Sequence, residues 1–209
     1  MMAKDTKSRI LDAALVRFSE KGYEGTNIRE VAESLGLGKS SLYRHFISKE
    51  EIWNTLIDEL IRYYEERFGS VENLPPIPQT AEELRSMTMR LINFTIHDEK
   101  IIRIRKILLT EQFRDDRVCE LATRYFHANL EEMFAKIFSG MMDRGILKKD
   151  DPGILAFSYT APISSLVQLH DREPKREREI MEKLEQFITH FISVYEIRRE
   201  PVQGEESQS

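Results

Sequence analysis

The stretch FSEKGYEGTNIREVAESLGLGKSSLYRHFISKEEIW, residues 18–53, decides the fold of the N-terminal part of this chain. Ala32, Gly36 and Leu42 lie in it at the spacing that two short, closely crossing helices need. A small residue lets the helices approach, a glycine tolerates the positive φ of a tight turn, and an apolar residue anchors the second helix inward. The order of these residues therefore predicts a helix-turn-helix.

The helix boundaries around this motif follow from capping residues. Asn27 with Glu30, and Ser48 with Glu51, have the spacing of a capping box, and Gly22 suits the position after a helix end. Elsewhere apolar residues recur every three or four positions. These signals predict four helices, over residues 7–21, 27–35, 39–46 and 49–68.

The charge is distributed unevenly along the chain. Residues 1–49 carry nine Lys/Arg and six Asp/Glu, a balance of +3, and the total of −5 then leaves −8 for the remainder. A basic end on an acidic body suits a protein that offers one end to DNA, although chance alone can give so modest an excess.

The same stretch resembles the DNA-binding domain of the TetR family of bacterial transcriptional regulators. The most specific shared element is Leu-Tyr-x-His-Phe-x-x-Lys, here residues 42–49. Two positions depart from the family pattern, since Gly38 replaces a usual capping serine and Ser40 replaces a common glycine. The other matching elements are Phe18, Lys21-Gly22-Tyr23, Thr26, Val31-Ala32, Gly36-Leu37 and Lys49-Glu50.

The resemblance implies that the third helix enters the major groove of a near-palindromic operator, bound by a homodimer. It implies base or phosphate contacts, with Arg44 suited to guanine and Lys49, at the start of the next helix, to a phosphate. Plain packing of Tyr43 and His45, and simple solvation of Lys39 and Arg44, are the alternatives. The predicted DNA-binding residues are Thr26, Arg29, Lys39, Ser40, Ser41, Tyr43, Arg44, His45 and Lys49.

Beyond this module the chain is predicted to be helical throughout, so the fold class is all-α. Three prolines within residues 69–79 indicate a linker, because proline lacks the backbone donor of a helix interior. Further helices are expected at 80–97, 99–113, 116–144, 152–172 and 176–198. The expected units are a DNA-binding domain at 6–66 with linking helix 49–68, a C-terminal helical bundle at 75–198, and a disordered tail at 199–209.

The last two predicted helices are unusually apolar, which favours a homodimer. Helices of this kind would expose a large apolar patch in a monomer, and a two-fold four-helix bundle would cover it. The alternative is that both helices pack within one subunit. The predicted interface residues are Leu166, Leu184, Phe187, Ile188, Phe191 and Tyr195.

Aromatic and methionine side chains within residues 80–160 are candidates for lining a ligand cavity, and the family resemblance implies a small-molecule effector. Such a stripe is more often plain core, and periodicity cannot separate a cavity lining from a core. Pro162 predicts a kink that would open space beside it. The candidates are Met87, Leu91, Phe94, Phe113, Tyr125, Phe126, Phe138 and Tyr159.

These features together predict a repressor that a small apolar ligand releases from its operator. The signal is expected to pass along the linking helix to Tyr64 and Phe68. The alternatives are a constitutive or architectural DNA-binding protein without an inducer and, less favoured for want of a catalytic motif, a helical enzyme.

Cofactors, metals and membranes have no support in the sequence. His97, His127, His170 and His190 lack zinc-ligand spacing, and nothing local activates Cys119. A single cysteine, a charged N-terminus and the lack of a long uncharged apolar run lead us to expect a cytoplasmic protein without a membrane span.

Overall fold

The computed structural model describes residues 5–68 and 75–197, without the side chains of residues 64, 65, 67 and 68. Its described part is all-α, and the only β-type pairing there is an isolated antiparallel bridge between Leu147 and Glu196. None of the described helices is long and apolar enough to cross a membrane.

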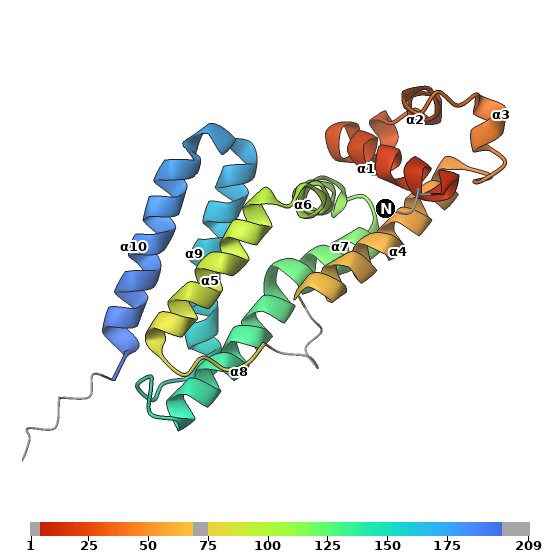
Figure 1. The fold of residues 1–209 in the computed structure, drawn as a ribbon. Helices are drawn as coiled ribbons and strands as arrows, with labels where there is room; N and C mark the ends of the chain where they lie inside the picture. Colours follow the sequence, from red (N-terminus) through yellow and green to blue (C-terminus); the bar gives the residue numbers. More distant parts are fainter. Residues whose placement is uncertain (1–4, 69–74, 198–209) are drawn as a thin grey trace, which may run out of the picture.

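The first four helices form a small unit at one end of the molecule (Figure 1). They are α1 (Thr6–Gly25), α2 (Ile28–Ser34), α3 (Lys39–Leu42) and α4 (Lys49–Phe68). The caps act as predicted: the Asn27 side chain accepts from the Arg29 N–H and the Ser48 hydroxyl from the Glu51 N–H. Gly22 has a φ of 71° inside α1, so the final turn of this helix bends away from its axis.

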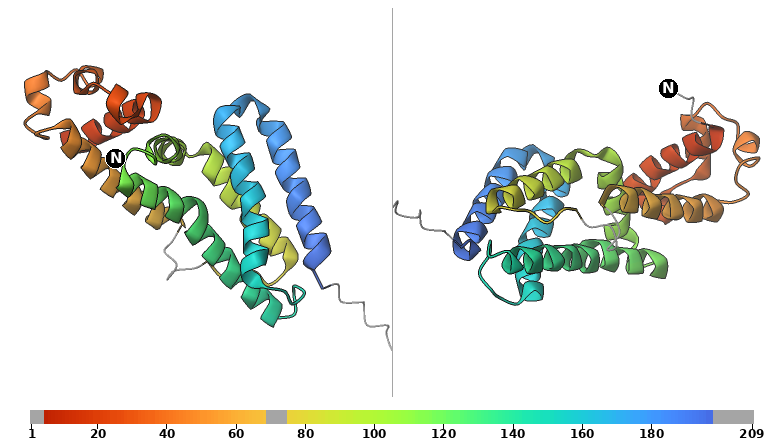
Figure 2. Two further views of the ribbon diagram at one scale, coloured as in Figure 1. Left: turned by 180° about the vertical axis from the view of Figure 1, so that it is seen from behind. Right: turned by 60° about the horizontal axis from the view of Figure 1, so that its bottom comes forward.

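The remaining helices pack into a second, larger bundle (Figure 2). They are α5 (Ala81–His97), α6 (Glu99–Glu111), α7 (Asp116–Thr123), α8 (Asn129–Asp143), α9 (Pro152–Arg172) and α10 (Glu177–Tyr195), with a short 3₁₀ turn at Pro174–Arg176. Asp151 caps α9 by accepting from the Ile154 N–H, and Pro152 occupies its first turn as predicted. The helix continues through Pro162.

Three predicted boundaries differ from the structure. The single helix expected at 116–144 is interrupted by a π-helical turn, Arg124–Ala128, between α7 and α8. The third helix ends at Leu42 rather than 46, because the chain turns to place Phe46 in the core. The last helix ends at Tyr195, where the backbone pairs with the segment after α8, and the predicted tail lies outside the described residues.

The apolar core does not follow the predicted division of the chain. One buried cluster joins α1, α2, α3 and α4 to α6 and α7, through residues such as Phe18, Leu56, Ile104 and Leu108. A second cluster joins α5, α8, α9 and α10. Helix α6 therefore packs with the N-terminal unit although it comes after the proline-rich segment.

Candidate functional site

The third helix and the turn after it present a row of polar side chains to solvent. Leu42 is fully buried and Phe46 is 1% exposed, so these two residues hold α3 against the core. Gly38 begins the helix without a side-chain cap. Around these anchors, the exposed predicted contact residues are Arg29, Lys39, Ser40, Tyr43, Arg44 and His45, with Ser41 partly buried.

Thr26 is buried in the structure, whereas we expected its side chain to contact DNA. Its side chain is 3% exposed, and its hydroxyl donates to the Gly22 carbonyl oxygen at 2.8 Å. The Thr26 hydroxyl proton is therefore donated to a carbonyl oxygen within the bent end of α1 and is not available to a DNA phosphate. We correct the assignment of the Thr26 hydroxyl to a structural role.

Lys49 lies at the start of α4, at the edge of this surface. Its ammonium group is 4.3 Å from the centre of the Tyr23 ring and 3.5 Å from the Glu24 carbonyl oxygen. Burial and the neighbouring Glu50 carboxylate raise the pKa of Tyr23, so this phenol stays neutral beneath the cation. The aromatic face holds the charge in position while leaving N–H donors available.

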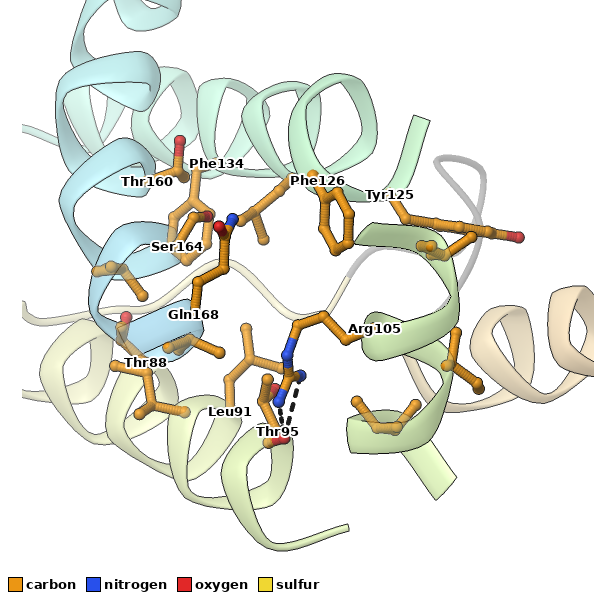
Figure 3. A pocket seen from close by; sticks show the side chains of 17 residues that line it. Thr88, Leu91, Thr95, Arg105, Tyr125, Phe126, Phe134, Thr160, Ser164 and Gln168 are labelled. Atoms are coloured by element: carbon orange, nitrogen blue, oxygen red, sulfur yellow. Dashed lines mark hydrogen bonds between the residues drawn. The ribbon is translucent and has the colours of Figure 1, made fainter. Parts of the chain in front are cut away.

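An apolar cavity lies within the C-terminal bundle, at the junction of the two core clusters (Figure 3). Its volume is about 100 Å³. The π-helical turn contributes Tyr125 and Phe126, and such turns frequently occur at functional sites. The lining residues are Thr88, Leu91, Ile92, Thr95, Ile101, Ile104, Arg105, Leu108, Tyr125, Phe126, Leu130, Phe134, Thr160, Ile163, Ser164, Val167 and Gln168.

Three of the eight predicted ligand-binding residues line this cavity: Leu91, Tyr125 and Phe126. The Phe113 side chain is 88% exposed, at the end of α6, and Phe94 faces a separate groove beside His97. Met87 packs against the second core cluster and does not line the cavity. Periodicity could not separate these positions, because it reports which face of a helix is apolar and not where space remains.

Phe138 and Tyr159 belong to an aromatic cluster outside the cavity. Their ring centres are 5.3 Å apart, and the Tyr159 ring centre lies 4.5 Å from that of Phe191. The Tyr159 hydroxyl donates to the Thr88 hydroxyl at 2.9 Å, and burial raises the pKa of Tyr159 well above its usual value. Both residues are fully buried and serve as core, which corrects the prediction.

The cavity wall contains one buried ion pair that sequence reasoning missed. Arg105 of α6 donates from Nε and Nη2 to the two carboxylate oxygens of Asp171 on α9, at 2.5 and 2.7 Å. It also donates to the Thr95 carbonyl oxygen at 3.2 Å. The two side chains are 7% and 5% exposed. Nothing in the sequence pairs these two residues, which lie on separate helices.

The far end of α6 contacts the N-terminal unit through polar groups. Glu111 is 3% exposed, and its carboxylate accepts from the Tyr23 backbone N–H at 3.2 Å. After α6, the Asp115 carboxylate accepts from the Trp53 indole N–H at 2.9 Å. Helix α6 therefore lines the cavity and holds α1, and the turn that follows it holds α4. The predicted coupling residues, Tyr64 and Phe68, have side chains outside the described part.

The predicted dimer residues divide into two groups. Leu184 and Ile188 are fully buried inside one protomer and Phe191 is 5% exposed, so they have no surface for a second copy and their assignment is corrected. Leu166, Phe187 and Tyr195 are partly buried. The exposed apolar side chains on α9 and at the end of α10 are instead Ile154, Phe157 and Val194.

The histidines form no metal site with the other described residues. Glu177 places one carboxylate oxygen 3.3 Å from His97 Nε2 and the other 3.3 Å from His170 Nε2. In the described ranges no group of three or more His, Cys, Asp or Glu side chains is arranged to hold a metal ion. Cys119 is exposed.

The N-terminal part of the chain matches a known protein family. Residues 10–56 match the model described as bacterial regulatory proteins, tetR family. Over 58 residues the chain is 40% identical to the biofilm operon icaADBC HTH-type negative transcriptional regulator IcaR of Staphylococcus epidermidis, covering 28% of this chain and 31% of that protein. Over 47 residues it is 49% identical to the Staphylococcus aureus IcaR, covering 22% of this chain and 25% of the other. The matched segment thus spans about a third or less of these curated relatives.

Solved structures share the whole architecture at low sequence identity. A complex of SmeT with triclosan matches with a TM-score of 0.68 and 18% identity, over 99% of this chain and 100% of that one. SmeT is described as the repressor of the Stenotrophomonas maltophilia multidrug efflux pump SmeDEF. A TetR-family transcriptional regulator from Cytophaga hutchinsonii matches with a TM-score of 0.64 and 18% identity, over 93% and 96% of the two chains. At such identities the likeness establishes the fold alone.

Proposed function

Because residues 10–56 match the model for bacterial regulatory proteins of the tetR family, we propose that this chain is a homodimeric DNA-binding repressor of that family, controlled by a small molecule. The single observation that carries the proposal is the exposure of Lys39, Tyr43, Arg44 and His45 around a helix that Leu42 anchors in the core. Lys39 is at the start of this short helix and the other three residues are in the turn after it, so all four are free to contact a major groove that the helix enters. The similarity to IcaR, described as a negative regulator, favours repression.

The DNA-binding part of this proposal is tested by selecting bound sequences from a random duplex library and measuring their affinity by fluorescence anisotropy. We expect a near-palindromic site, because two symmetric recognition helices contact successive major grooves. Arg44→Ala should relax the preference at one base position, with a loss of about 1–3 kcal/mol. Lys149→Ala, an exposed cation after α8, is the matched control and should bind like the parent. Failure to enrich any sequence would contradict the proposal.

The dimer is proposed to form on the exposed side of α9 and α10. Ile154 and Phe157 are 68% and 55% exposed on α9, and Val194 is 40% exposed on α10. The bridge between Leu147 and Glu196 brings the start of α9 and the end of α10 to the same end of the bundle. These side chains therefore form an apolar surface that a second copy would cover.

Phe157→Glu should give a monomer, because a charge in a desolvated interface has no partner. Phe113→Glu is the matched control, since Phe113 is 88% exposed but lies at the end of α6. Light scattering after gel filtration measures both. A dimeric Phe157→Glu variant would place the interface elsewhere.

Helix α6 is proposed to carry the signal from the cavity to the DNA-binding unit. Ile101, Ile104, Arg105 and Leu108 line the cavity, and Glu111 at the other end accepts from Tyr23. A ligand that displaces this helix would therefore shift α1 and α4 together. A change in operator affinity of 10- to 100-fold requires only about 1.4–2.8 kcal/mol of coupling. The presence of a cavity supports this reading over a constitutive DNA-binding protein.

A further inference from the structure

The Gln168 side chain, which lines the cavity, forms no hydrogen bond with the other described residues. The Gln168 side chain projects from α9 into the cavity (Figure 3). An amide carries two N–H donors and one acceptor oxygen, and none of these bonds to the hydroxyl-bearing residues that also line the cavity, Thr88, Thr95, Thr160 and Ser164. A ligand group that both donates and accepts would satisfy it.

The only charged side chain that lines the cavity within the described part is already neutralised. Of the five N–H groups of Arg105, two go to Asp171 and two more toward the Thr95 carbonyl, leaving one on Nη1. The carboxylate of Asp171 balances the guanidinium, so the pair has no net charge. A carboxylate ligand would have to compete with Asp171, and an ammonium ligand would meet the guanidinium.

The size of the cavity limits the ligand to a small body. Its volume of about 100 Å³ is below the ~150 Å³ of an engineered apolar cavity that holds benzene. Even a single ring must therefore push the wall outward. Aliphatic and aromatic groups, including Ile104, Leu108, Phe126, Phe134 and Val167, make up most of that wall.

We propose that the cavity binds an uncharged molecule with a short apolar body, such as a single ring, and one hydroxyl or carboxamide group that hydrogen-bonds to Gln168. This inference rests on the proposed function only in calling that molecule the effector. The binding itself follows from the unused amide, the neutralised Arg105 and the apolar wall.

Four probes with one common body test the proposal: ethylbenzene, 2-phenylethanol, phenylacetate and 2-phenylethylamine. Isothermal titration calorimetry on the full chain without DNA measures their affinities. We expect 2-phenylethanol to bind at least roughly 100-fold more tightly than either charged probe, because an unpaired charge is costly to bury. No detectable binding of 2-phenylethanol, or tighter binding of phenylacetate, would overturn the proposal.

The role of Gln168 is isolated by a cycle with Gln168→Leu, which keeps the size of the side chain. The affinity ratio of 2-phenylethanol to ethylbenzene should fall about tenfold in this variant, the value of one hydrogen bond. Gln186→Leu, at an exposed position of α10, is the matched control and should keep the parent ratio. Circular dichroism confirms that both variants fold. An unchanged ratio in Gln168→Leu would overturn the assignment.

Ligand binding and the role of the ligand as effector are tested separately. If 2-phenylethanol binds as expected but leaves the anisotropy of bound DNA unchanged, the ligand class stands and its role as effector fails. If DNA binding follows Arg44→Ala as expected while none of the four probes binds, the DNA-binding function stands and this inference fails.

Discussion

The surface around α3 and the cavity between α6 and α9 differ in whether their charged side chains are exposed to solvent. On α3 and the turn that follows it, the side chains of Lys39, Tyr43 and Arg44 are exposed, and the buried residues beneath them are apolar. In the cavity wall the charged pair of Arg105 and Asp171 is buried, and the space beside it is apolar. The first region works through groups that solvent already reaches, so a substitution there changes recognition more than stability. The second region works through groups removed from water, so the same kind of substitution changes stability.

The difference also has a consequence for coupling. A buried region can convert the binding of a small molecule into movement of a helix, because close-packed interiors transmit strain from one element to the next. Helix α6 extends from the cavity to the contacts of Glu111 and Asp115 with the N-terminal unit. The comparison therefore predicts large energetic effects at the cavity, intermediate ones where the regions meet, and small ones on the DNA-binding surface.

The largest expected effect is that of Asp171→Ala. The substitution leaves the Arg105 guanidinium buried without its counter-charge, which should lower the free energy of unfolding by about 3–5 kcal/mol. Urea denaturation measures it. The exposed pair of Lys149 and Asp143 gives the control, since Asp143→Ala should cost less than about 1 kcal/mol. Equal costs for the two variants would break the comparison.

Gly22→Ala tests the contact between the regions. Gly22 has a φ of 71°, and a Cβ at this position would lie 2.5 Å from Glu111 Oε1. We expect a loss of about 1–2 kcal/mol from the left-handed backbone, together with displacement of the Glu111 carboxylate from the Tyr23 N–H. Gly36→Ala, with a φ of 68° but nothing within 4 Å, is the control that shows the backbone cost alone. A Gly36→Ala variant that loses as much effector response as Gly22→Ala would remove Glu111 from the coupling route.

Trp53→Phe tests the contact between α4 and Asp115, which follows α6. It keeps an aromatic ring against Phe18 and Tyr23 but removes the N–H that donates to Asp115. We expect a cost of about 1 kcal/mol in thermal unfolding and a weaker response of operator affinity to effector. Operator affinity in the absence of effector should stay close to that of the parent. A variant with the full effector response would show that Asp115 plays no part in coupling.

The smallest effect on stability is expected for Lys49→Ala on the DNA-binding surface. Its ammonium lies over Tyr23, where an exposed cation–π contact contributes at most about 1 kcal/mol. Removal of one phosphate contact should reduce the slope of log affinity against log salt concentration by about 1 for every sequence tested. Anisotropy titrations at several salt concentrations measure the slope. An altered base preference with an unchanged slope would contradict the phosphate role.

Most of the N-terminal unit could be predicted from the sequence because its determinants are local. Asn27, Ser48, Gly22 and Gly36 act on the backbone within a few residues, so their effects are visible in the order of the chain. Leu42 was expected to anchor the second helix of the motif inward, and it is fully buried. Thr26 was misplaced because the side chain bonds across a helix break, to Gly22, which a pattern of residues does not show.

The sequence by itself determined the all-α class, the helix-turn-helix and the exposed cations of α3, because capping, turn chemistry and helical periodicity operate over a few residues. Only the tertiary structure decided that α6 packs with the N-terminal unit, that Arg105 pairs with Asp171, and that Leu184 and Ile188 belong to the core of one protomer. Only the tertiary structure also decided which aromatic residues border empty space. Each of these depends on distances between segments far apart in the chain, and a cavity is the space that packed side chains fail to fill, which no single residue encodes.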